Sequence, residues 1–367
     1  MDILPCYRKY NHSRFTGGGI IVEKDALVRV GVAGLGRSGW DIHVRLMRPL
    51  TSQFKIAAVF DQDAGRLKQA ADEFGCTTYS SFEAMIADKT LELVVVAMPN
   101  HLHAKCAMAA LKAGKQVVCE KPLATSLADA DKMIACAKRC RRLLSVFQNR
   151  RYQPEFLAVQ KVIKSGVLGR VFHIRMGVYG FSRRWDWQTL KKFGGGLLNN
   201  HGPHYLDQAL QLFGPGTPKV FCVRERALIL GDAEDHAVVT LSGKRHPTIQ
   251  LELTSACAYP QEPWLVLGTL GSLTGGGKEL HWKYIDPSKL PPRTVDIRPT
   301  PDRSYNRETY EFVEGSWSKD TDASPGEVGF YLDLYKTLRE RAKLVVTPEQ
   351  VRRQMWVLEQ CRKLAQV

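Results

Sequence analysis

The first residues whose spacing could do chemistry form a glycine cluster at the end of a β-rich run. Residues 28–39 read Val-Arg-Val-Gly-Val-Ala-Gly-Leu-Gly-Arg-Ser-Gly, so Gly34, Gly36 and Gly39 form a GxGxxG motif. The first glycine permits a tight turn, the second lets a pyrophosphate approach the backbone, and the third lets the next helix pack on the strand. The motif therefore predicts a dinucleotide site built on free amides at a helix start.

An acidic residue further along the chain indicates which dinucleotide this site prefers. Asp61 ends the next β-rich run, about 20 residues after the glycines, where a carboxylate can accept hydrogen bonds from a ribose 2′-hydroxyl. A 2′-phosphate would be repelled there, and the next residue is Gln62 rather than an arginine. NAD is therefore expected in preference to NADP.

Two more polar segments follow β-rich runs. Residues 98–103 read Met-Pro-Asn-His-Leu-His, and residues 119–122 read Cys-Glu-Lys-Pro. Because parallel strands bind ligands at their carboxyl ends, both segments should lie at the nucleotide-binding edge of the sheet.

With these motifs in this order, the sequence resembles the glucose-fructose oxidoreductase, inositol dehydrogenase and rhizopine catabolism (Gfo/Idh/MocA) family. Residues 149–152 (Asn-Arg-Arg-Tyr) and 194–204 (Gly-Gly-Gly-Leu-Leu-Asn-Asn-His-Gly-Pro-His) match it too, and the resemblance runs from Val28 to the C-terminus. It implies a Rossmann domain followed by an α/β domain with an open sheet. It also implies association through the exposed face of that sheet, as a homodimer or homotetramer.

The resemblance implies that Lys121 lies beside the nicotinamide and the substrate hydroxyl, and that His204 accepts the hydroxyl proton. Hydride leaves a carbinol carbon only if a positioned base takes that proton, and histidine titrates near pH 6.5. A cationic lysine favours the developing alkoxide. Asn200 stands where the family usually has aspartate, and an amide cannot supply the negative charge that would raise the pKa of His204 or Lys121.

The remaining site expectations follow from these motifs. The expected cofactor contacts are Gly34, Leu35, Gly36, Arg37, Ser38, Gly39, Asp61, Pro99, Asn100, His103, Glu120 and Lys121. Residues 183–188 place aromatic rings beside charges, which suits a polyhydroxylated ring, although a packed loop is the alternative. The expected substrate contacts are Arg151, Tyr152, Trp185, Asp186, Asn200 and His204. No metal is expected, because the histidines lack zinc spacing and hydride transfer needs none.

Two kinds of element must position these residues, and together they predict an α/β fold with two sheets. Up to residue 148, β-rich runs alternate with helix-period segments, which is typical of a doubly wound parallel sheet. Beyond it, longer strands separated by turn clusters indicate a mostly antiparallel sheet. The expected divisions are an extension over 1–26, the NAD-binding domain over 27–148, a substrate and oligomerisation domain over 149–346, and a last helix over 347–367.

Composition limits the class of protein. The chain has 367 residues, 44% of them hydrophobic, which suits a two-domain globular protein and excludes a small disulfide scaffold. No apolar run approaches the ~20 residues of a membrane span. The nine cysteines, an odd and scattered number, indicate reduced thiols and a cytoplasmic location.

The excess of basic residues bears on the kind of ligand that the protein binds. The net charge is +15, and residues 148–200 contain ten Lys or Arg against two acidic residues. Such a stretch is either a solvated face or a match for an acidic or phosphorylated substrate. Nucleic acid is not expected as a partner, because no helix-turn-helix or zinc-finger motif is present.

The sequence therefore predicts an NAD-dependent dehydrogenase acting on a secondary hydroxyl of a sugar, cyclitol or sugar acid. Two alternatives stay open. The chain could be an NAD-dependent glycoside hydrolase that oxidises its substrate only transiently, or a nucleotide-binding regulator that senses sugars. The intact Glu-Lys-Pro segment and His204 argue against the regulator.

Overall fold

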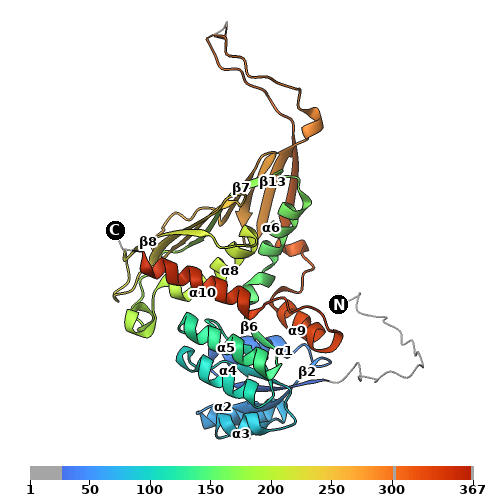
Figure 1. The fold of residues 1–367 in the computed structure, drawn as a ribbon, viewed down its shortest axis with the longest axis vertical. Helices are drawn as coiled ribbons and strands as arrows, with labels where there is room; N and C mark the ends of the chain where they lie inside the picture. Colours follow the sequence, from blue (N-terminus) through green and yellow to red (C-terminus); the bar gives the residue numbers. More distant parts are fainter. Residues whose placement is uncertain (1–26, 301–302, 365–367) are drawn as a thin grey trace, which may run out of the picture.

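Two sheets organise the molecule, which the computed structural model describes over residues 27–300 and 303–364 (Figure 1). The first sheet has six parallel strands in the order β3-β2-β1-β4-β5-β6. Its strands are β1 (Val28–Ala33), β2 (Phe54–Phe60), β3 (Thr77–Tyr79), β4 (Leu93–Val96), β5 (Gln116–Cys119) and β6 (Leu144–Val146). Its helical segments are η1 (Ser38–Val44), α1 (Arg45–Met47), α2 (Ala64–Phe74), α3 (Phe82–Ala87), α4 (His103–Lys112) and α5 (Leu127–Cys140). Its central strands are almost wholly buried, as continuous apolar runs in a helix-covered sheet should be.

The second sheet has eight strands in the order β14-β13-β12-β11-β7-β10-β9-β8, and only its β7–β10 pair is parallel. The strands are β7 (Val171–Tyr179), β8 (Lys219–Glu225), β9 (His236–Ser242), β10 (Thr248–Thr254), β11 (Trp264–Gly268), β12 (Gly271–Gly276), β13 (Glu279–Ile285) and β14 (Phe312–Ser318). Helices α6 (Pro154–Ser165) and α8 (Gly202–Phe213) cover one face, so buried residues alternate along β9. Between β13 and β14, residues 286–300 and 303–311 leave the sheet as a long exposed projection (Figure 1).

The last two long helices join the sheets. Helix α9 (Gly329–Glu340) buries Phe330 and Tyr331 in the core of the first sheet, although the predicted division placed residues 149–346 in the second domain. Helix α10 (Pro348–Lys363) begins with a threonine cap at Thr347 and lies between the sheets (Figure 1). It contributes side chains to both cores. No helix in the described part of the chain is long and apolar enough to cross a membrane.

Candidate active site

The glycine turn after β1 has the shape that a pyrophosphate needs. Gly34 has φ of +90°, and a side chain there would lie 2.5 Å from the carbonyl oxygen of Ala97, which follows the neighbouring strand β4. A side chain at Gly39 would collide with the carbonyl of Gly34, whereas nothing lies within 4 Å of the position a side chain would take at Gly36. The first and third glycines therefore permit close packing, and the second leaves backbone open to the adjoining cavity.

A cavity of about 560 Å³ lies at the carboxyl ends of the first sheet and against a loop of the second domain. It brings together most of the residues expected from sequence. Those that line it are Gly34, Gly36, Arg37, Ser38, Asp61, Pro99, Asn100, His103, Glu120, Lys121 and Asn200. Leu35 and Gly39 are buried beneath this lining and support the turn. The open glycine backbone and the adjacent acid fit a dinucleotide.

Asp61 is held rigidly at the end of β2. Its Oδ2 accepts a hydrogen bond from the Leu35 amide at 2.6 Å, and its Oδ1 accepts one from the Asp63 amide at 2.9 Å. Arg66, which the sequence reasoning missed, also lines the cavity, with its guanidinium 3.5 Å from Asp61. Gln62 is the neighbour of Asp61 in sequence, but helix α2 brings the Arg66 guanidinium back to the Asp61 carboxylate.

Lys121 connects the two domains. It follows β5, and its Nζ donates a hydrogen bond of 3.3 Å to the main-chain oxygen of Asn200 at the end of α7 (Leu197–Asn200). Burial lowers the pKa of Lys121, while the negative charge of Glu120 acts in the opposite direction. The lysine thus lies at the boundary between the nucleotide-binding edge and the second domain.

His204 lies in the first turn of α8, four residues beyond Asn200, and does not itself line the cavity. Its Nδ1 is buried and has no hydrogen-bond partner among the described residues. Burial, followed by the positive charges of Lys121 and Arg150, lowers its pKa well below the ordinary value. The ring is therefore neutral near pH 7, the form that a general base requires. Burial and the same charges lower the pKa of neighbouring His201 to about 4.

His103 shows a supporting contact where a ligand contact was expected. Its ring nitrogens lie 2.7 Å from the carbonyl oxygen of Pro122 and 2.8 Å from that of Met98. Its ring therefore lies between the two strand-end segments, and whichever nitrogen carries the proton donates to a backbone carbonyl.

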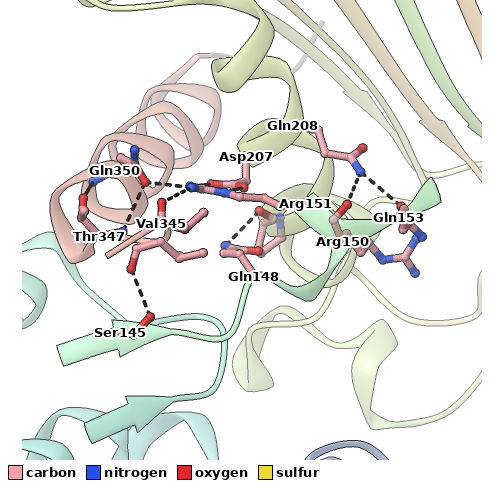
Figure 2. Close-up of polar contacts among 12 residues, drawn as sticks. Ser145, Gln148, Arg150, Arg151, Gln153, Asp207, Gln208, Val345, Thr347 and Gln350 are labelled. Atoms are coloured by element: carbon pink, nitrogen blue, oxygen red, sulfur yellow. Dashed lines mark hydrogen bonds and ion pairs between the residues drawn. The ribbon is translucent and has the colours of Figure 1, made fainter. Parts of the chain in front are cut away.

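Arg151 and Tyr152 are absent from the cavity lining. The Arg151 guanidinium makes two hydrogen bonds to Asp207, of 2.5 and 2.6 Å, and reaches Gln350 on α10 (Figure 2). Tyr152 donates to Asp333 on α9 at 2.9 Å. Both side chains join elements from distant parts of the chain, so they are not available to a substrate.

Trp185 and Asp186 are also absent from the cavity lining. Trp185 is 76% exposed, and Asp186 is occupied by the Arg184 guanidinium and the Gln188 amide. The lining comes instead from the residues just beyond them, which the sequence reasoning did not select. These are Trp187, Gln188, Phe193, Gly194, Gly195 and Asn199. The aromatic segment 183–188 and the glycine run that begins at Gly194 do mark this part of the cavity in the sequence. The backbone conformation of the segment decides which of its side chains face the cavity, and that is not visible in the sequence.

Comparison with known proteins agrees with this architecture. Residues 28–148 match the Gfo/Idh/MocA family, described as an oxidoreductase family with an NAD-binding Rossmann fold, and residues 156–274 match its C-terminal domain. The scyllo-inositol 2-dehydrogenase (NADP(+)) IolW of Bacillus subtilis is 28% identical over 338 residues, which cover 88% of this chain and 89% of that protein. The 2,7-anhydro-N-acetylneuraminate hydratase of Escherichia coli is 30% identical over 257 residues, 67% of each protein.

A solved NAD-binding protein from Listeria innocua has the same fold. It superposes with a TM-score of 0.75 at 26% identity, and the match covers 92% of this chain and 97% of that one. The predicted α/β class with a parallel and a mostly antiparallel sheet is thus confirmed. The chain belongs to the Gfo/Idh/MocA family of oxidoreductases, with an NAD(P)-binding Rossmann domain followed by the family's C-terminal domain.

Proposed function

We propose that this protein is an NAD-dependent dehydrogenase that acts on a secondary hydroxyl of a sugar, cyclitol or sugar acid. The observation that carries the proposal is the contact between Lys121 of the first domain and the Asn200 backbone, beside the neutral ring of His204. NAD, when bound, supplies the hydride acceptor at its nicotinamide ring. The open glycine turn and Asp61 would hold its pyrophosphate and ribose.

Lys121 and His204 have different roles at the substrate oxygen. The Lys121 ammonium donates a hydrogen bond to that oxygen and stabilises negative charge developing on it. A ring nitrogen of His204 takes the hydroxyl proton. Because the ring is neutral without any carboxylate beside it, Asn200 in place of aspartate is compatible with this role.

The charges beside Lys121 favour an acidic substrate. Arg150 donates to the hydroxyl of Tyr205 at 2.6 Å but takes part in no ion pair among the described residues. Its charge acts on Lys121, His201 and His204, so it lies close to all three. Glu120 is the carboxylate that acts on Lys121, and the Arg150 charge acts on Glu155. Two cations so close together suit a substrate that brings its own negative charge. The similarity to a hydratase named for a carboxylate sugar points the same way.

NAD is proposed over NADP on the strength of Asp61. Its carboxylate faces the cavity, where it would repel a 2′-phosphate. Arg66 beside it and the similarity to the NADP-dependent IolW oppose this preference, so both nucleotides belong in the assay.

The assay measures NADH or NADPH formation with neutral sugars, inositols, uronates and sugar phosphates. We expect turnover with NAD and an acidic class, and a loss of at least ~100-fold in Lys121→Met and in His204→Ala. The matched control is Lys105→Met, an exposed lysine on α4, which should retain full turnover. Near-wild-type turnover in either site variant would refute the assignment.

Transient oxidation is the second candidate, favoured by the similarity to the hydratase. In that case substrate is consumed without accumulation of reduced nucleotide. Product analysis of the same reactions by mass spectrometry distinguishes the two, since hydration or cleavage changes the substrate mass differently from loss of two hydrogens.

We also propose that a second copy of the chain covers the outer face of the second sheet. Leu265 and Leu267 of β11 and Val238 of β9 point away from the helix-covered core and are half-buried. Arg175, paired with Leu265 across the strands, has a buried Nε without a partner in the described residues. Sedimentation should show a dimer or tetramer, and Leu265→Arg should yield monomers that still bind NAD. A wild-type monomer would contradict this.

A further inference from the structure

The carboxylate that precedes Lys121 is buried and needs partners. Glu120 is 6% exposed; its Oε2 accepts a hydrogen bond of 2.8 Å from the Lys121 amide, and its Oε1 lies 3.2 Å from Nε2 of His43. Nε2 forms no hydrogen bond of good geometry among the described residues, so this 3.2 Å approach to Glu120 is its polar contact. A buried carboxylate without such contacts would be costly and would protonate.

His43 is itself fixed from a distant part of the chain. It lies on η1 (Ser38–Val44), and its Nδ1 is 2.6 Å from the hydroxyl of Tyr331 on α9, 288 residues later. The ring also packs on Phe147, with centroids 4.3 Å apart, and neither His43 nor Tyr331 is exposed. If the tyrosine hydroxyl donates to Nδ1, the ring proton is on Nε2, where it faces Glu120.

This arrangement links His43 to Lys121 through charge. Burial alone would raise the pKa of Glu120, but His43 and Lys121 together hold it below its usual value. Burial lowers the pKa of Lys121, Glu120 raises it, and Arg150 and Arg37 lower it further. The titratable groups that face this pair from all sides are Arg37, His43, His103, Cys119, Arg150, His201, His204 and Tyr331, none of which is a carboxylate. Glu120 is therefore the counter-charge of Lys121 within this set.

We infer that His43 and Tyr331 are positioning residues, which hold the Glu120 carboxylate in place so that Lys121 stays cationic. The inference rests on the proposed function for its catalytic consequence, but the state of Lys121 can be measured without turnover. These contacts join distant parts of the chain within the first core, because Tyr331 lies 288 residues after His43.

The first experiment follows the titration of Lys121 by NMR of isotope-labelled lysine, with Lys121→Met assigning the signal. In His43→Phe we expect the Lys121 pKa to fall by about one unit or more, because Glu120 loses its donor. His43→Gln keeps an N–H that can reach Glu120, so the Lys121 pKa should return most of the way to the wild-type value. In Tyr331→Phe the Lys121 pKa should fall less than in His43→Phe. Phe147→Leu removes packing from the His43 ring without removing a polar contact, so the Lys121 pKa should stay at its wild-type value.

A double-variant cycle tests whether the effect passes through Glu120. Glu120→Gln alone should lower the Lys121 pKa, and adding His43→Phe to it should lower it no further. In the dehydrogenase assay, the alkaline limb of kcat should move to lower pH in His43→Phe and recover in His43→Gln.

The outcomes separate the two claims. An unshifted Lys121 titration in His43→Phe, with only the melting temperature reduced, would mean that His43 is merely structural and would overturn the inference. Absence of turnover in the wild type, together with the expected NMR shifts, would instead count against the proposed function and leave the positioning role supported.

Discussion

At the scale of single residues, burial and nearby positive charges lower the pKa of the candidate base His204, and the uncharged Asn200 does not oppose them. Burial, and then the charges of Lys121 and Arg150, already lower the pKa of His204 well below its ordinary value. The unprotonated ring therefore persists as pH falls below 6.5, and kcat/KM of the wild type should stay level through mildly acidic pH.

The substitution Asn200→Asp should reverse part of the lowering of the His204 pKa. An added carboxylate favours the cationic forms of His204 and Lys121, so both pKa values rise. The acidic limb of kcat/KM should move to higher pH by about one unit, and the alkaline limb should move up with it. The pH–rate profile is the measurement.

A control for Asn200→Asp is Asn199→Asp, which adds the same charge next door, on a side chain whose Oδ1 accepts hydrogen bonds from Arg362. The acidic and alkaline limbs of the pH–rate profile should move less in Asn199→Asp than in Asn200→Asp. Equal displacement in the two variants would show that net charge, and not the position of residue 200, controls the base.

At the scale of elements, the Arg151–Asp207 ion pair joins the segment after β6 to α8 and α10 (Figure 2). Both side chains are buried, at 6% and 1% exposure. Asp207→Asn leaves a buried guanidinium without its charge partner, so the free energy of unfolding should fall by about 3–5 kcal/mol. Urea unfolding measures the change.

The exposed ion pair of Asp131 on α5 with Arg352 on α10 offers the comparison, because it also joins two elements. Exposed pairs contribute little, so Asp131→Asn should cost no more than ~1 kcal/mol. If Asp207→Asn cost as little as Asp131→Asn, the buried pair would not be the connection described here.

These elements also show how far sequence reasoning reaches. The strands of the first sheet follow the apolar runs that predict a parallel sheet, apart from β3, whose Thr77 and Thr78 are exposed and carry no such pattern. Glycine spacing located the cavity because it reflects backbone geometry. Arg151 was expected in the cleft because sequence gives a residue's type but not its partner, and Asp207 lies 56 residues away.

At the scale of the whole molecule, the chain returns to the first domain after building the second. Helix α9 buries Tyr331 in the first core, and α10 places Val351 in the first core and Leu358 in the second. A single rigid helix shared by two cores couples their stabilities, because neither core can lose α10 without exposing apolar side chains.

The two domains should therefore unfold as one cooperative unit, even though only the first holds the nucleotide motif. NAD should raise the unfolding midpoint of both, since it binds the folded form alone. Leu358→Ala, which opens a cavity in the second core at a cost of about 2–5 kcal/mol, should lower both midpoints together. Hydrogen exchange in urea, read separately for peptides from β1 and from β10, measures each domain. Two separated transitions, or a midpoint for β10 that does not respond to NAD, would show that α10 leaves the domains independent.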